Sequence, residues 1–102
     1  MDKNEFIKRM EMSLEATKML PDDLEPINVW INGANEGQHF PQITVYESYK
    51  TRPNGFYAFA DAVGKMARRL DQGDHDALLF DLDNGVQIYM VMSKEELDDE
   101  DA

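Results

Sequence analysis

Residues 78–90, LLFDLDNGVQIYM, decide how the second half of the chain folds. Two apolar runs flank a short polar segment with a glycine, a pattern typical of a β-hairpin. A three-residue loop at 83–85 sets Phe80 opposite Ile88 and makes one face of the hairpin wholly apolar. A two-residue loop would mix acidic and aliphatic side chains on both faces. Burial of one apolar face therefore favours the longer loop, with Gly85 in the left-handed conformation.

The same residues contain Asp-x-Asp shortly before a glycine, which is similar to the motif that opens the active site of phosphotransferases of the haloacid dehalogenase type. Three features depart from that family: Asn84 precedes the glycine, a strand follows the motif, and few residues remain downstream. A calcium loop needs a glycine at its sixth position and helices on both sides. Counted from Asp81, the glycine is fifth and the flanks are strands. We interpret the motif as a turn.

The first half of the chain predicts one helix and two strands. Residues 4–20 repeat apolar side chains at helical spacing, and Pro21 ends the helix. Residues 27–31 and 42–48 alternate in the manner of strands and predict a hairpin with a long loop. The side chains expected in the core are Phe6, Ile7, Met10, Leu14 and Thr17 of the helix, and Ile27, Val29, Ile31, Ile43 and Val45 of the strands.

Residues 56–70 predict a second amphipathic helix, with Gly73 as a C-terminal cap. Together with the last hairpin, the order of elements is α-β-β-α-β-β. We expect an α+β fold in which both helices pack on one face of a four-stranded antiparallel sheet. Residues 1–92 form this single domain, and residues 93–102 form an acidic, flexible C-terminal tail.

Charge is distributed unevenly along the chain, whose formal net charge is −11. Residues 1–70 carry ten acidic and nine basic side chains, whereas residues 71–102 carry eleven acidic side chains and one basic. Such a field disfavours direct contact with nucleic acid or anionic lipid and favours a partner protein with a basic surface. Because no apolar run can span a membrane and no signal core is present, we expect a cytoplasmic protein.

Catalytic chemistry has little support in the sequence. There is no cysteine, no nucleophile motif and no phosphate-binding glycine loop. Asp74, His75 and Asp76 set an imidazole between two carboxylates, but three adjacent loop residues do not converge easily on one ion, and zinc needs further ligands. We expect no catalytic residue, no metal and no cofactor. A small metal-dependent protein or enzyme that uses these residues or Asp81 is one of three hypotheses for the function, and we rank it third, after the two described next.

The outer face of the expected sheet, away from the helices, combines aromatic side chains with a polar rim, as protein interfaces do. The first hypothesis is a non-catalytic protein-interaction module, in its sharper form an inhibitor that mimics nucleic acid and blocks a basic nucleic-acid-binding surface. The second is a homo-oligomer, such as a homodimer, that packs through this face in a structural or accessory role. The expected partner-binding residues are Trp30, Tyr46, Leu79, Asp81, Tyr89, Val91, Glu95, Glu96, Asp98 and Asp99.

Overall fold

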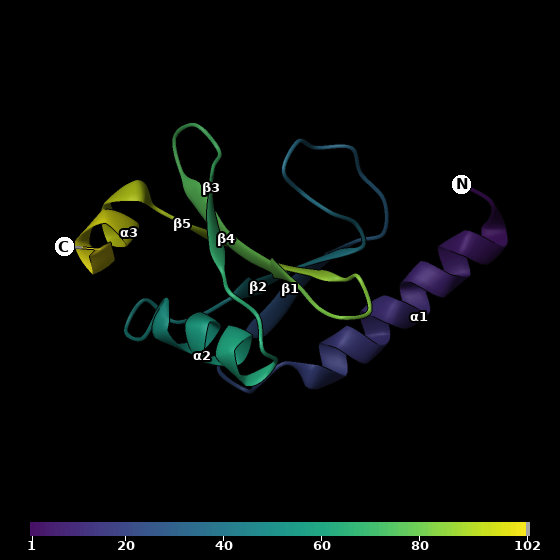
Figure 1. Ribbon diagram of the computed structural model, residues 1–102, viewed down its shortest axis with the longest axis horizontal. Helices are drawn as coiled ribbons and strands as arrows, with labels where there is room; N and C mark the ends of the chain where they lie inside the picture. Colours follow the sequence, from purple (N-terminus) through teal and green to yellow (C-terminus); the bar gives the residue numbers. More distant parts are fainter. Residues whose placement is uncertain (102) are drawn as a thin grey trace.

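The computed structural model describes residues 1–101, with side chains described as far as Asp99. The α+β class is confirmed, but the fold has a third helix and a fifth strand that the prediction lacks. The elements in chain order (Figure 1) are α1 (Lys3–Met19), β1 (Glu25–Trp30), β2 (Gln42–Tyr46), α2 (Asn54–Ala62), β3 (Arg68–Asp71), β4 (Asp76–Asp81), β5 (Gln87–Met92) and α3 (Lys94–Asp101).

The β4–β5 hairpin has the register predicted from its pattern. Phe80 lies opposite Ile88. The loop closes through a hydrogen bond of 2.8 Å from the Leu82 amide to the Val86 carbonyl, and Gly85 has a φ of 94°. The three-residue loop with a left-handed glycine is therefore confirmed.

The sheet has five strands in the order β1-β2-β5-β4-β3, and it is mixed. β5 pairs in parallel with β2 and antiparallel with β4, while the β1–β2 and β3–β4 pairs are antiparallel. The predicted four-stranded antiparallel sheet is therefore wrong. The chain leaves β2, passes through α2 and the β3–β4 hairpin, and returns as β5 beside β2.

The segment predicted as one helix over 56–70 divides at Gly64, which has a φ of 74°. The Lys65 amide donates to the Ala60 carbonyl at 2.8 Å, and the Gly64 amide donates to the Asp61 carbonyl at 3.0 Å. These two bonds form a Schellman motif, which ends α2. The released residues pair with β4 as strand β3, so Arg69 and Leu70 are strand residues.

The first turn of α2 is capped by a side chain from the end of β2. The fully buried carboxylate of Glu47 accepts hydrogen bonds from the backbone amides of Gly55 at 2.8 Å and Phe56 at 2.9 Å. The Thr51 hydroxyl donates a third bond at 2.8 Å. Gly55 permits this approach, since a Cβ atom there would lie 2.7 Å from a carboxylate oxygen of Glu47. Glu47 thus satisfies amides that helix termini leave unpaired.

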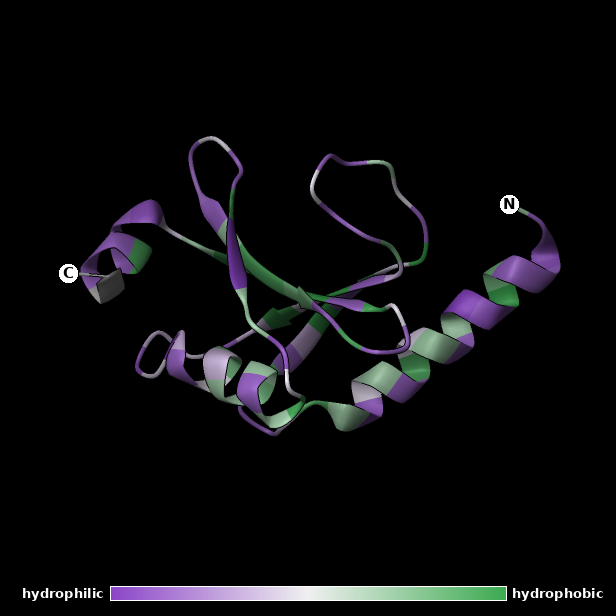
Figure 2. Ribbon diagram, viewed as in Figure 1, coloured by the Kyte–Doolittle hydropathy of each residue, from purple (hydrophilic) through white to green (hydrophobic). Residues whose placement is uncertain are grey.

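The main core lies between α2 and the sheet. Phe80 of β4 makes edge-to-face contacts with Phe56 and Phe59 of α2, at ring-centroid distances of 5.2 and 5.6 Å. Hydrophobic residues concentrate in β4 and β5 (Figure 2), and nearly every side chain of these two strands is buried, on both faces of the sheet. The two central strands therefore hold core on either side.

Helix α1 does not bury the stripe predicted for it. Its buried residues are Ser13 and Ala16, because these lie on the side that meets the sheet. The amino-terminal half of the helix projects away from the sheet (Figure 1). Four apolar side chains expected in the core, Phe6, Ile7, Met10 and Leu14, are exposed, as are Ile27 and Val29 of β1.

The segment 93–102 is helical over α3, and Leu97 of this helix is buried in the main core. Residue 102 lies outside the described residues. The flexibility of this segment stays a prediction. Over the part of the chain that the structure describes, no helix has both the length and the apolar character needed to cross a membrane.

Replacing Glu47 by alanine should strongly destabilise the fold. The change leaves two buried amides and a hydroxyl without their acceptor, which costs about 3 kcal/mol of unfolding free energy. Urea denaturation measures the loss, with Glu36→Ala in the exposed loop as the matched control, for which we expect a change within about 0.5 kcal/mol. Equal stability of the two variants would show that Glu47 does not cap α2.

Candidate functional site

The outer face of the sheet, away from α2, brings together polar side chains from four strands. Strand pairing sets Asp81 opposite Gln87, Gln87 opposite Gln42, and Gln42 opposite Trp30. One row of side chains therefore crosses this face from β4 to β1. A neighbouring row contains Tyr89, which pairs with Thr44 of β2 and Leu79 of β4.

The structure separates the predicted apolar residues of this face into two groups. Trp30 is 52% exposed, and Tyr46 and Val91 are also exposed. Leu79 is fully buried and Tyr89 is only 8% exposed, so the expectation that both lie open on the outer face is wrong. They form a second core cluster with Ala77 and Leu70.

Two segments cover this second cluster. Leu70 reaches it from β3, the strand that was predicted as helix. The loop at 31–41 is held over it by a hydrogen bond of 3.2 Å from the Arg68 guanidinium to the Gly37 carbonyl. Gly37 has a φ of 77°, and a Cβ atom there would lie 2.9 Å from Leu70. Close contact between the loop and β3 therefore requires glycine at this position.

A chain of side-chain amides runs beneath the loop and begins at Asp81. The Asp81 carboxylate accepts a hydrogen bond from the side-chain nitrogen Nε2 of Gln87 at 3.1 Å. The side-chain oxygen Oε1 of Gln87 in turn accepts a hydrogen bond from Gln42 Nε2 at 2.8 Å. A second contact of 2.8 Å joins Asp81 to Nδ1 of His39. Because an ionised carboxylate only accepts hydrogen bonds, Asp81 sets the direction in which both amides point.

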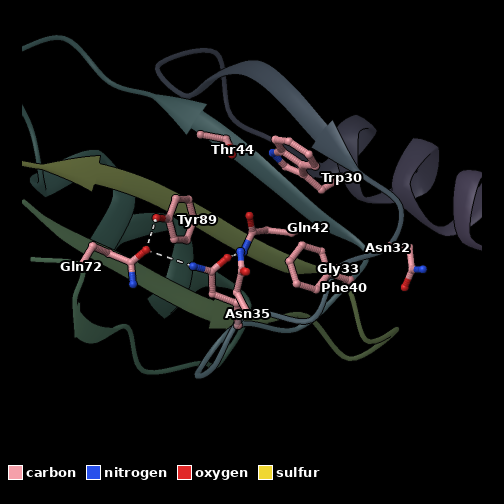
Figure 3. A pocket seen from close by; sticks show the side chains of 10 residues that line it. Trp30, Asn32, Gly33, Asn35, Phe40, Gln42, Thr44, Gln72 and Tyr89 are labelled. Atoms are coloured by element: carbon pink, nitrogen blue, oxygen red, sulfur yellow. Dashed lines mark hydrogen bonds between the residues drawn. The ribbon is translucent and has the colours of Figure 1, made fainter.

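The hydrogen-bonded chain continues from Gln42 into the loop and on to Gln72, which directly follows β3. Gln42 Nε2 also donates to Gln38 Oε1 at 3.1 Å, and Gln38 Nε2 donates to Gln72 Oε1 at 3.0 Å. The Tyr89 hydroxyl donates to the same Gln72 oxygen at 3.2 Å. One directed series of hydrogen bonds thus joins the strands, the loop and the segment after β3, and Figure 3 shows the part of it from Gln42 to Tyr89.

A cavity of about 380 Å³ opens between this loop and the outer face. Its wall includes the aromatic residues Trp30, Phe40 and Tyr89 and the carboxamides of Gln42 and Gln72 (Figure 3). None of the ten residues that line it is charged. The size and mixed lining are typical of small-molecule sites.

The acidic helix α3 is attached at the other end of the sheet. Arg52 donates two hydrogen bonds to the Glu96 carboxylate, at 2.8 and 3.1 Å, and its guanidinium lies 5.9 Å from the centroid of the Tyr46 ring. The bonds from Arg52 hold the pKa of the Glu96 carboxyl below its ordinary value. Such bidentate pairs combine strength with a defined geometry.

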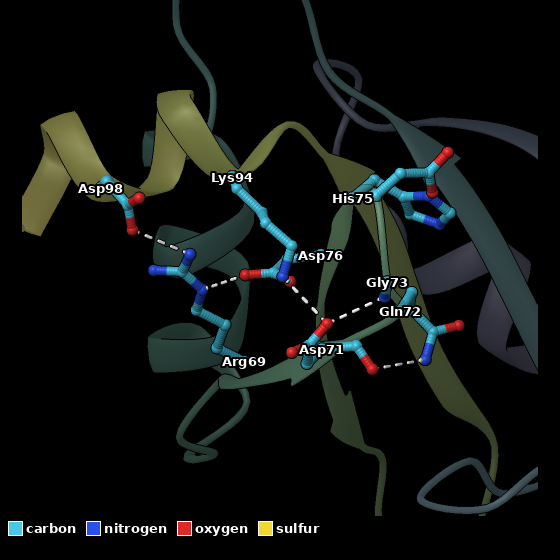
Figure 4. Close-up of polar contacts among 9 residues, drawn as sticks. Arg69, Asp71, Gln72, Gly73, His75, Asp76, Lys94 and Asp98 are labelled. Atoms are coloured by element: carbon cyan, nitrogen blue, oxygen red, sulfur yellow. Dashed lines mark hydrogen bonds and ion pairs between the residues drawn. The ribbon is translucent and has the colours of Figure 1, made fainter.

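A second set of ion pairs centres on the buried carboxylate of Asp76 (Figure 4). Lys94 contacts it at 2.8 Å, and Arg69 also donates to it. The hydrogen bond from Lys94, with that from Arg69, holds the pKa of Asp76 below its ordinary value in spite of its burial. Arg69 reaches on to Asp98 at 2.9 Å, and Lys94 to Asp71 at 2.9 Å. Two cations thus tie the start of α3 to β3 and β4.

The acidic residues of α3 that were predicted to contact a partner therefore fall into two groups. Glu96 and Asp98 are paired within the fold, whereas Glu95 and Asp99 are exposed. Asp74 contacts the His75 ring at 2.9 Å, while Asp76 belongs to the ion pairs of α3. Among the described residues, no group of three histidine or acidic side chains is placed to hold a metal ion.

Sequence reasoning missed the glutamines of the outer face and the cations that hold α3. One signal was present in the sequence. Gln42 and Gln87 occur within predicted strands, and a polar side chain that is buried in a strand needs a hydrogen-bond partner. No comparable signal marked Arg69, since its role depends on β3 being a strand.

Acid should weaken the attachment of α3. The pKa values of Asp76 and Glu96 are lowered in the folded state, so their pairs stabilise the fold above about pH 5, and this stabilisation is lost as the pH falls below about 4. We expect Asp76→Asn to lower the melting temperature at pH 7, and we expect this difference from the wild type to shrink as the pH falls below about 4. Thermal unfolding followed by circular dichroism measures both.

The control for this experiment is Asp99→Asn, which removes an exposed carboxylate of the same helix that is ion-paired with no described residue. We expect it to keep the wild-type pH dependence. If it loses acid sensitivity as Asp76→Asn does, the general negative charge, rather than the pairs around Asp76, controls the response.

Comparison of the chain with protein-family models, with curated proteins and with solved structures found no match.

Proposed function

We propose that this protein is a non-catalytic protein-interaction module that docks through α1 and β1. The observation that carries the proposal is the exposed apolar stripe of α1. Phe6, Met10 and Leu14 follow one another at intervals of four residues, so they lie in one line along the helix, and Leu14 is 56% exposed. Helices gain most of their stability from packing an apolar face, so this line fits a surface that a partner covers.

Strand β1 extends this surface. The Arg9 guanidinium of α1 contacts the Ile31 carbonyl at 3.4 Å, which places the helix beside the end of the strand. Val29 lies opposite the buried Ile43 but is itself exposed, and β1 forms an edge of the sheet. The α1–β1 surface is defined by Phe6, Ile7, Met10, Leu14 and Val29.

The finer part of the proposal concerns the acidic end. Residues 71–102 carry eleven acidic side chains and one basic, and α3 presents Glu95 and Asp99 outward. We infer that this end, with Tyr46 and Val91 at the adjacent ends of β2 and β5, meets a basic surface of the partner and competes there with nucleic acid. Charge complementarity of this kind favours rapid association and selects the partner.

A homo-oligomer is the second candidate. All six residues of the edge strand β1 are exposed, so a second copy could pair with it edge to edge. The α1–β1 surface supports such a contact better than the outer face, where the loop at 31–41 covers part of the sheet. Light scattering of the purified chain separates self-association from a heterologous complex.

A photo-reactive phenylalanine analogue at position 14 should cross-link to the partner in extract of the native host. The matched control carries the same analogue at position 66, where Met66 is an exposed apolar residue outside the α1–β1 surface. We expect one discrete product from position 14 and at least about tenfold less from position 66. A product of twice the chain mass supports the homo-oligomer, and equal labelling at both positions would exclude a docking surface on α1.

Salt and oligonucleotide test the acidic contact in the same assay. Raising the ionic strength from about 0.05 to about 0.5 M screens exposed charges, so the yield from position 14 should fall. Excess duplex DNA should lower it further at constant salt. A yield that is insensitive to both would contradict competition for a basic nucleic-acid-binding surface.

A further inference from the structure

The cavity beneath the loop at 31–41 lies on the outer face, whereas Val29 of the α1–β1 surface lies on the core side of β1. Its volume of about 380 Å³ is near the lower end of the range for ligand sites, roughly 300–1,000 Å³. A compound of one or two rings fits such a space better than an extended chain.

The lining excludes charged ligands. All ten residues around the cavity are uncharged, so a phosphate, carboxylate or ammonium group would enter without an ionic partner. The acidic character of the whole chain disfavours anions further. The ligand should therefore be neutral and should bind through ring contacts and hydrogen bonds.

Gln42 provides one oriented acceptor on the cavity floor. Its Nε2 hydrogens are both used, by Gln38 at 3.1 Å and by Gln87 at 2.8 Å. Its Oε1 accepts no hydrogen bond from the residues that the structure describes and is open to the cavity, since no buried side-chain oxygen among them lacks a partner. Figure 3 shows this oxygen directed toward Trp30 and Tyr89. Since Asp81 fixes the direction of the amide chain, Gln42 presents an acceptor, and not a donor, to a ligand in the cavity.

Trp30 offers a ring face at the rim. Its indole is half-exposed and lies on the same side of the sheet as Gln42, its strand neighbour. Figure 3 shows the carboxamides of Gln72, Asn35 and Asn32 on different sides of the aromatic rings. An arrangement of one apolar face and several scattered amides suits a ring that has an apolar C–H face and hydroxyl groups around its edge.

We propose that this cavity binds an uncharged saccharide, with one sugar ring stacked on Trp30 and one hydroxyl donating to Gln42 Oε1. A nucleoside shares the neutral ring and the hydroxyl groups, and it forms the second arm of the test.

The test is titration of the ¹⁵N-labelled full chain with glucose, galactose, mannose, N-acetylglucosamine, maltose and cellobiose, and separately with uridine and adenosine. The chain has one tryptophan, so the indole N–H signal of Trp30 reports the site without ambiguity. We expect at least one sugar to shift this signal and the Gln42 side-chain signals with a dissociation constant on the order of 1 mM.

Three variants make the result specific. Trp30→Ala should weaken binding by about tenfold or more, measured on the Gln42 signals. Asp81→Asn allows the amide chain to reverse, so Gln42 can present its nitrogen, and binding should weaken about threefold or more. Tyr49→Ala removes an exposed aromatic ring outside the cavity and should leave binding unchanged.

The proposal is overturned if no sugar shifts the Trp30 signal, or if nucleosides shift it and sugars do not. Equal binding by Trp30→Ala and the wild type also overturns it. Unchanged binding in Asp81→Asn overturns the role of the Gln42 oxygen.

Discussion

Burial of β5 on both faces is the constraint on which the rest of the structure depends. This strand lies between β2 and β4, with Ile88 and Met90 in the main core and Gln87 and Tyr89 turned to the outer face. Since both faces are covered, α2 must close one side, and the loop at 31–41, together with the Leu70 side chain of β3, must close the other. The amide chain follows from this arrangement, because a glutamine buried in a central strand needs partners for its polar atoms.

The same arrangement explains how a strongly acidic chain folds. The central strands carry few charges, and the acidic residues that follow β5 are held by cations from elsewhere in the sequence. Arg52 comes from the loop before α2, and Arg69 comes from β3. These contacts keep α3 against the body of the protein, while Glu95 and Asp99 are exposed. The acidic end and the projecting half of α1 lie at opposite ends of the molecule (Figure 1).

The sequence correctly predicted the elements whose residue pattern is compatible with only one arrangement. The prediction failed where the pattern is compatible with two arrangements. The β4–β5 register was predictable because a slip of one residue exposes Phe80 and Ile88. Residues 68–71 read equally well as helix, and only the position of Gly64 and the pairing with β4 decide for a strand. On α1, helical spacing located an apolar stripe but could not show that Ser13 and Ala16 face the sheet. The sequence analysis placed Trp30 on the outer face, and so anticipated part of the site there. It could not predict which segments cover this face, because strand β3 was not expected.

The parallel pairing of β2 with β5 is the central claim, and nuclear Overhauser contacts between backbone protons test it most directly. The structure places Ile43 beside Ile88 and Thr44 beside Tyr89, with a bond of 2.9 Å from the Gln87 amide to the Pro41 carbonyl. We expect contacts between amide protons and Hα protons across these strands, in the staggered pattern of parallel pairing. Hα–Hα contacts between β2 and β5, which antiparallel strands produce, or contacts of β2 with β4, would contradict the account.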